Sequence, residues 1–149
     1  MNKDAATPLP AYTACFVCGK ENAGGLKIEF RASGEGVEAD FRPKPFMAGY
    51  KQLVHGGITC AVLDDALVWA VFRKAGQFGV TAELSVRFLK PLFIGSDYRV
   101  RGVAGDVKRR IMTAEAELYD KRNTLMARAS GKVMLFSDEQ MKKIHQSEG

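Results

Sequence analysis

The sequence predicts an α+β domain in which one antiparallel sheet is wrapped around a single long helix. Three observations predict this class. The expected order is two strands, one helix and four strands, without the further crossover helices that a parallel sheet needs. The apolar run of residues 58–72 is too long for a typical strand, and the segments around it alternate with a period of two. A chain of 149 residues fits one domain, which we place at residues 1–149.

The first third of the chain predicts a hairpin with loose segments on either side. We expect residues 1–14 to form a loose N-terminal arm, followed by the turn-rich stretch CFVCGKENAGGL. The segments LKIEF (26–30) and VEADF (37–41) alternate apolar and polar residues. Because SGEG lies between them, we expect them to pair as a β-hairpin. Residues 42–54 contain two prolines and a glycine, which favours a loop.

The central apolar run predicts a helix that is buried on nearly every side. His55 can cap its start, while Arg73 and Lys74 suit the negative end of the helix dipole. Gly76 then suits the position just beyond the last turn. The helix therefore ends within the stretch RKAGQFG.

Two adjacent carboxylates, Asp64 and Asp65, interrupt this apolar run. Charged groups are costly to bury, so each needs a partner or a function. On a helix, neighbouring residues lie about 100° apart, so one carboxylate can face a site while the other meets sheet, solvent or a salt-bridge partner. A purely structural role at a subunit seam stays open for either residue.

Strands follow the helix to near the end of the chain. We expect them over 80–88, 98–107, 111–119 and 124–136, and a short helix begun by Ser137 or Asp138 in the tail 137–149. Strict alternation places Thr81 on the polar face of the first of these strands, opposite Val80 and Leu84. Gly102 and Gly105 suggest bulges or bends in the second.

Charge and hydropathy exclude several classes of partner. The net charge is +5, but basic residues are scattered among acidic ones, so we expect no nucleic-acid partner. A modest positive charge suits a small phosphorylated ligand instead. Residues 1–12 lack the apolar core of a secretory leader, and no apolar stretch is long enough to span a membrane. We therefore expect a cytoplasmic protein with no membrane partner.

The three cysteines suggest neither disulfides nor a metal. An odd count without a secretory leader argues against a disulfide framework. Cys15 and Cys18 form a CxxC, but a structural zinc needs four ligands, and Cys60, His55 and His145 have no matching spacing. We expect no metal and interpret the CxxC as a tight turn with two partly buried thiols. Cys60 is also a poor nucleophile candidate, because no histidine free to activate it lies near it in sequence.

The start of the helix is a candidate anion site. Gly56 and Gly57 leave backbone N–H groups open to a ligand or to a developing oxyanion, although they also suit simple tight packing. Asp64 lies about 12 Å further along the helix, at 1.5 Å per residue, so it cannot easily reach this site. A two-fold dimer with antiparallel helices would bring the acid of one chain to the glycines of the other.

The sequence also resembles a known family. HGGITCAVLDDA resembles the HGG-x-x-x-x-L-x-D helix signature of hotdog-fold thioesterases, in the phenylacetate-pathway (PaaI) and THEM-like branch. VTAELSVRFLKPL resembles the strand that follows this helix, VKRRI a later turn, and CFVCGKENAGGL a leading segment of this branch. The resemblance covers residues 15–136.

The resemblance implies a hotdog fold that forms homodimers and often homotetramers, with active sites at the subunit interface. It implies hydrolysis of an acyl-CoA to free acid and CoA, with CoA as part of the substrate and no further cofactor. Asp64 matches the catalytic acid, acting as general base or nucleophile. Gly56 of the other chain would supply the oxyanion N–H, with Gly57 as helper and His55 shaping the turn. Thr81 matches a hydroxyl that positions water. Segments that hold CoA match Lys90, Pro91, Lys108, Arg109 and Arg110.

The sequence departs from the family at one position and leaves other functions open. Some relatives carry an amide side chain six residues before the histidine; here that residue is Gly49, and Gln52 is the nearest substitute. A hotdog protein that binds or senses an acyl-CoA without cleaving it is one alternative. A hotdog hydratase or dehydratase is another, but it usually needs a histidine inside the helix rather than at its start. The acyl group is not identified by the sequence.

Overall fold

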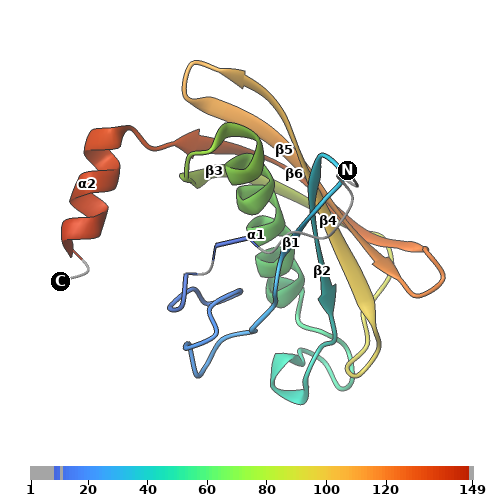
Figure 1. Ribbon diagram of the computed structural model, residues 1–149. Coiled ribbons are helices and arrows are strands. Elements are labelled where there is room, and N and C mark those ends of the chain that lie inside the picture. Colours follow the sequence, from blue (N-terminus) through green and yellow to red (C-terminus); the bar gives the residue numbers. More distant parts are fainter. Residues whose placement is uncertain (1–8, 11, 148–149) are drawn as a thin grey trace, which may run out of the picture.

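The computed structural model describes residues 9–10 and 12–147. Most of the expected arm 1–14 and the last two residues of the tail therefore lie outside the described residues. The elements, in order, are β1 (Arg31–Ser33), β2 (Gly36–Phe41), the 3-10 helix η1 (Pro45–Met47), α1 (Gly56–Ala75), β3 (Gly79–Phe88), β4 (Tyr98–Lys108), β5 (Ile111–Asp120), β6 (Leu125–Leu135) and α2 (Asp138–Ser147). Figure 1 shows their arrangement.

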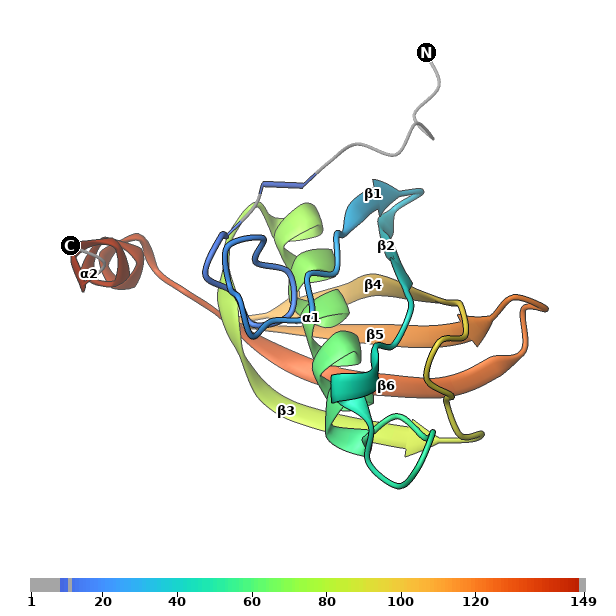
Figure 2. The same cartoon turned by 90° about the horizontal axis from the view of Figure 1, so that it is seen from below.

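The strands form one antiparallel sheet that curls around α1, in the order β1-β2-β4-β5-β6-β3 (Figure 2). This confirms the predicted fold class. The concave face holds the core, and the fully buried Leu63 and Leu67 of α1 lie at its centre. Burying each leucine contributes about 1.5–3 kcal/mol.

Glycines let the helix lie close to the sheet. A Cβ at Gly102 of β4 would lie 2.5 Å from the carbonyl oxygen of Ala66, and one at Gly131 of β6 would lie 2.8 Å from the Leu67 side chain. Gly102 forms no β-bulge, because this residue pairs regularly with Val37 and Ala116. The irregularity in β4 lies further on, between Ala104 and Val107, and includes Gly105.

The first strand lies later in the chain than the alternation predicts. β1 covers residues 31–33 instead of 26–30. Lys27 has a φ of 54°, which interrupts extended pairing, and residues 26 and 28 instead bond to Phe16 and Val17. Leu26, Ile28 and Phe30 are buried as the alternation predicts. The alternation therefore predicts correctly which side chains are buried. Residues 26–28, however, pair with the loop that precedes them and not with the next strand.

The central helix begins and ends at the residues that the sequence indicates. The His55 side chain caps α1 by accepting from the Gly57 N–H at 2.8 Å. At the other end, Gly76 adopts a left-handed conformation with a φ of 69°, which favours glycine. The helix is five residues longer than the apolar run, because Gly56, Gly57 and the last basic turn belong to it.

The edge strand β3 contains a β-bulge that alternation does not predict. Thr81 pairs with Val133, yet Glu83 pairs with Lys132, so Ala82 is an extra residue on β3. The bulge reverses the facing of the residues before it. Thr81 therefore faces inward with Leu84, and its predicted place on the polar face is wrong.

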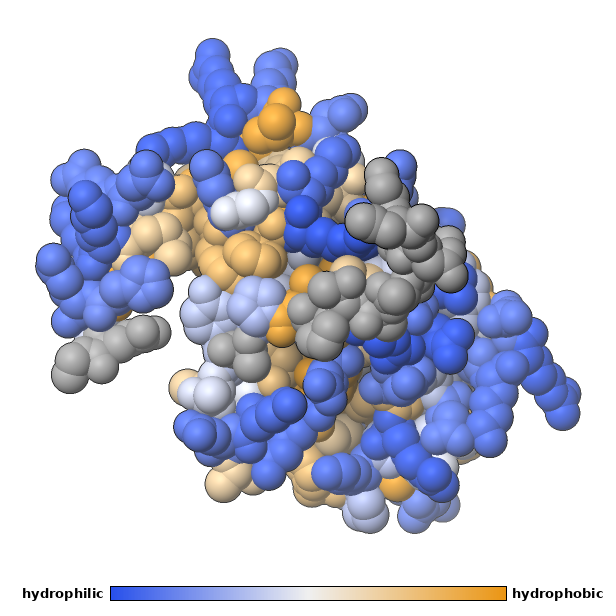
Figure 3. Space-filling view, viewed as in Figure 1, coloured by the Kyte–Doolittle hydropathy of each residue, from blue (hydrophilic) through white to orange (hydrophobic). Residues whose placement is uncertain are grey.

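The chain ends in a short helix that lies away from the sheet. Ser137 caps α2 through its hydroxyl, which accepts from the Gln140 N–H at 3.1 Å, and the Gln140 side chain accepts in return from the Ser137 N–H. Figure 3 shows apolar surface between α2 and the rest of the molecule. Among the described residues, no helix is long and apolar enough to cross a membrane.

Candidate functional site

Asp64 and Thr81 meet between α1 and β3. The Thr81 hydroxyl donates to Asp64 Oδ1 at 2.6 Å, and both side chains are partly buried. The contact exists because the bulge at Ala82 turns Thr81 toward the helix. Among the residues that the structure describes, none donates to the other carboxylate oxygen, Oδ2, so Asp64 keeps acceptor capacity for water or substrate.

The start of α1 presents one open backbone donor. The N–H of Gly57 is occupied by His55, while the N–H of Gly56 has no acceptor among the residues that the structure describes. Residues 55–57 are all exposed. The helix dipole and an open N–H favour an anion here. The two glycines therefore differ. The sequence suggested two open N–H groups, but the N–H of Gly57 is already bonded to His55.

The two halves of the expected site do not meet within one chain. The helix runs without interruption from Gly56 to Ala75, so Asp64 stays about 12 Å from Gly56 along the axis. His55 is fixed at the same end by its backbone bond to Met47 and by its capping bond. It therefore does not form an acid–base pair with Asp64 of its own chain.

A side chain at position 49, where the resemblance expects an amide, would crowd the start of the helix. A Cβ on Gly49 would lie 3.1 Å from His55 Cα, which is tighter than ordinary contact. The backbone of Gly49 bonds to Leu53, and the Gln52 carbonyl accepts from Ile94. Gln52 itself is exposed beside this turn.

The residues expected to hold CoA lie at two opposite ends of the sheet. Lys90 and Pro91 line a hollow of about 270 Å³ that also includes Gly56 and Phe88. The turn at residues 108–110 lies at the far end, where β5 begins opposite the end of β6 (Figure 1). Within one chain, Lys90 and Pro91 therefore lie near the start of α1, whereas the turn 108–110 does not.

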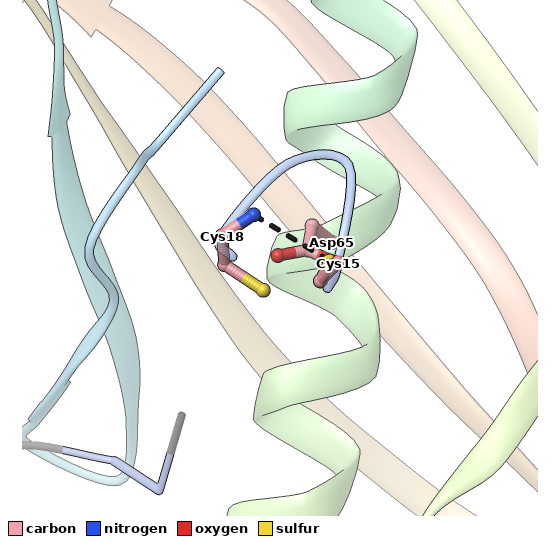
Figure 4. A group of neighbouring side chains, drawn as sticks. All are labelled: Cys15, Cys18 and Asp65. Carbon is pink, nitrogen blue, oxygen red and sulfur yellow. Dashed lines mark hydrogen bonds between the residues drawn. The ribbon is translucent and has the colours of Figure 1, made fainter. Parts of the chain in front are cut away.

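Asp65 lies on another side of α1 and has three partners. Trp69 donates from Nε1 to Asp65 Oδ2 at 3.2 Å, and the Cys15 thiol lies 3.8 Å from Oδ1. Cys18 completes the group, with all ligand atoms of the two thiols and the carboxylate within 4.8 Å of one another. Figure 4 shows the loop with both cysteines folded over the helix.

Burial shapes the acidity of this group. It raises the pKa of Asp65 to about 6, although hydrogen bonds from Cys18 and Trp69 oppose the rise. Burial, then the charge of Asp65, raise the pKa of the Cys18 thiol. Sequence reasoning missed this cluster because it looked for ligands among cysteine and histidine alone. The available signal was Trp69, one turn after Asp65, together with the unexplained CxxC.

Cys60 lies one turn before Asp64 and remains a weak nucleophile candidate. Burial and the charge of Asp64 raise its pKa, which disfavours the thiolate. Ser85 of β3 is exposed and faces outward. It pairs with Ser130 of β6.

The fold is that of the hotdog thioesterases. The family model of the thioesterase superfamily matches residues 51–127, which include α1, β3, β4 and β5. The chain belongs to the thioesterase superfamily. An uncharacterized protein of Schizosaccharomyces pombe is 32% identical over 104 residues, which are 66% of this chain and 59% of that protein. The matched region thus spans less than two thirds of that relative.

Solved structures show the same fold. Protein RHA08564 of the thioesterase superfamily matches with a TM-score of 0.73 at 22% identity, over 82% of this chain and 60% of its own. A putative thioesterase related to phenylacetic acid degradation, from Ralstonia eutropha, matches at 0.66 and 26%, over 75% and 87%. A Streptococcus mutans protein bound to acetyl CoA matches at 0.68 and 15%, over 74% and 89%. The Ralstonia eutropha match supports the PaaI-like branch that the helix motif indicates, and the other two show the fold.

Proposed function

We propose that this protein is a cytoplasmic acyl-CoA thioesterase that hydrolyses its substrate to a free acid and CoA. The observation that carries the proposal is the 2.6 Å hydrogen bond from Thr81 to Asp64 in a chain of the thioesterase superfamily. It holds a carboxylate on a partly exposed side of the helix with acceptor capacity to spare. The CoA complex of the Streptococcus mutans protein supports the choice of thioester.

The proposed site combines groups from two chains. Two copies with antiparallel helices would place Asp64 of one copy near the open N–H of Gly56 of the other. Two features favour such a pair. The long strand β3 is an open edge of the sheet, and the side of α1 around Asp64 carries the partly exposed residues Ala61 and Val68. A homodimer is therefore the unit we propose, and a homotetramer its further assembly.

The chemistry needs few groups. Asp64 accepts a proton from water that attacks the thioester carbonyl, and Thr81 keeps the carboxylate oriented. Negative charge that develops on the carbonyl oxygen meets the Gly56 N–H and the positive end of the helix dipole. The tetrahedral intermediate then expels the CoA thiolate, which takes the proton from Asp64. Direct attack by Asp64 on the carbonyl is the other route, and it would form a mixed anhydride that water hydrolyses.

The same pairing gives CoA two points of attachment. Lys90 and Pro91 line the hollow beside Gly56. The turn of Lys108, Arg109 and Arg110 lies at the other end of its own sheet, and an antiparallel partner would turn that end toward this hollow. Arginine suits phosphate because its guanidinium offers a planar fork of donors.

A thiol-release screen over aryl, short-chain and medium-chain acyl-CoAs tests this function. We expect turnover of at least one class by the wild type and almost none by Asp64→Asn, with an unchanged circular dichroism spectrum and oligomeric state. Binding of acyl-CoA without turnover over the whole panel would instead identify a sensing protein. After a single turnover in H₂¹⁸O, label in Asp64 would establish direct attack, because the general-base route places the label in the free acid alone.

A further inference from the structure

A second cluster of ionisable groups lies on α1, and the proposed thioesterase chemistry does not use it. It consists of Cys15, Cys18 and Asp65, and each of the three residues is partly buried. Within the described residues, two thiols and one carboxylate thus converge across 50 positions of sequence. Groups of this kind repel one another when they are ionised and attract a cation.

We propose that Cys15, Cys18 and Asp65 bind a zinc ion, with water as the fourth ligand. Thiolate and carboxylate oxygen are both zinc ligands, and the C-x-x-C spacing is typical of zinc sites. Softer ligand sets without oxygen would favour copper(I), and all-oxygen sets magnesium or calcium. The mixed set therefore selects zinc among the common ions.

The distances are close to those of a tetrahedral site. With bonds of about 2.3 Å to sulfur and about 2.0 Å to oxygen, tetrahedral ligands lie about 3.8 Å apart for two sulfurs and about 3.5 Å for sulfur and oxygen. Cys15 Sγ is 3.8 Å from Asp65 Oδ1, and all three ligand atoms lie within 4.8 Å. A shift of at most about 1.3 Å, within the reach of a thiol rotamer change, completes the geometry.

The surroundings already orient the ligands. The Trp69 indole occupies Oδ2 of Asp65 and leaves Oδ1 directed at the thiols. The backbone N–H of Cys18 donates to Cys15 Sγ at 3.5 Å, a bond that stabilises a thiolate. Outer hydrogen bonds of this kind fix ligands at metal sites. Because the three residues are partly exposed, water can reach the fourth position.

Zinc here would fasten the N-terminal loop to the helix turn that carries Asp64. Backbone bonds such as Gly19 to Cys15 and Leu26 to Phe16 are internal to this loop, whereas the Cys15 thiol reaches the helix at Asp65. A bound cation would also neutralise the second carboxylate next to Asp64. The existence of this site therefore does not depend on the proposed hydrolysis.

Cobalt(II) binding to the reduced, full-length protein tests the proposal. We expect one Co²⁺ per chain, a thiolate-to-cobalt charge-transfer band in the near ultraviolet, visible bands of tetrahedral intensity, and loss of all bands when Zn²⁺ is added. Cys15→Ser, Cys18→Ser and Asp65→Asn should each weaken Co²⁺ binding by more than about a hundredfold, which exceeds the usual effect of losing an outer hydrogen bond. Cys60→Ser is the matched control and should bind as the wild type does.

Several results would overturn the site. One is a reduced, folded wild type without a charge-transfer band, and another is a band that survives all three ligand substitutions or disappears with Cys60→Ser. Circular dichroism checks the fold of each variant. If a cysteine variant does not fold, the wild type and Asp65→Asn still decide, because asparagine keeps the shape and the bond to Trp69 but loses the anionic ligand. None of these readouts requires thioesterase activity.

Discussion

Two neighbouring carboxylates on one helix have entirely different surroundings. Asp64 faces the edge strand β3, accepts one bond from Thr81, and lies beside residues that are open to a partner. Asp65 faces the N-terminal loop, where an indole and two thiols surround it. A rotation of about 100° between successive helix residues is enough to separate a chemically available carboxylate from an enclosed one. The comparison shows that two carboxylates of the same residue type become chemically different through their burial and their hydrogen-bond partners.

The largest expected effect separates these two carboxylates by activity. Asp64→Asn should lower kcat/KM for the best acyl-CoA by on the order of 10³-fold, because it removes the general base or nucleophile. Asp65→Asn should change kcat/KM less than about threefold, since its carboxylate faces away from the proposed site. Steady-state thiol release by both variants measures the contrast. Equal losses of activity in the two variants would contradict the claim that only Asp64 faces the proposed site.

The next effect concerns the backbone donor at the start of α1. Gly56→Pro should lower kcat by about 10²-fold, because proline lacks the N–H that would hold the oxyanion. Proline is favoured at the first helical position, so the fold should survive. Gly56→Ala is the matched control, since it keeps the N–H and its Cβ would lie 3.6 Å from Phe88, an ordinary contact.

These two Gly56 variants also test the role of the helix start independently of the acid. A similar kcat for Gly56→Pro and Gly56→Ala would show that the Gly56 N–H takes no part in the reaction. Ligand binding should weaken less than turnover, because the oxyanion develops in the transition state. Comparison of KM with kcat for both variants measures this distinction.

A smaller effect is expected from the hydroxyl that orients Asp64. Thr81→Val keeps the shape of the side chain and removes the donor at 2.6 Å, so kcat should fall about tenfold, the equivalent of about 1.4 kcal/mol. The change should fall on kcat more than on KM, because the hydroxyl orients the reacting carboxylate. Ser85→Ala, on the outward face of the same strand, should leave both constants unchanged. A kcat equal to that of the wild type would limit Thr81 to packing.

Thr81 also shows where sequence reasoning succeeds and where it stops. The family resemblance selected this hydroxyl, while strict alternation placed it on the wrong face. One extra residue, Ala82, reverses the facing, and nothing in the local sequence distinguishes a bulged from a regular strand here. Element types and most boundaries follow from periodicity because one face of every strand is buried. A bulge depends on pairing with β6, which periodicity does not report.

The Asp65 cluster shows a second limit of the sequence. Helix geometry predicted that the two carboxylates diverge, and this is confirmed. The partner of Asp65 could not be predicted, because Cys15 lies 50 residues earlier and reaches the helix only through the folded path of the loop. Local spacing identifies a CxxC, whereas its third member is a tertiary contact.

The last expected effect is on stability instead of activity and concerns Asp65 alone. Its pKa of about 6 in the folded protein lies above the value of 3.8 that it has without burial. Between about pH 4 and pH 6 the unfolded chain therefore releases this proton while the folded chain keeps it, so the contribution of Asp65 to stability falls as pH rises. The full change is on the order of 2–3 kcal/mol. Asparagine does not titrate, so Asp65→Asn should gain stability relative to the wild type by this amount between pH 4 and pH 7. Urea unfolding at both pH values, with a chelator present, measures the difference. Equal gaps at the two pH values would mean that Asp65 has the same pKa in the folded and the unfolded protein, and that the thiols and Trp69 stabilise its charge as well as water does.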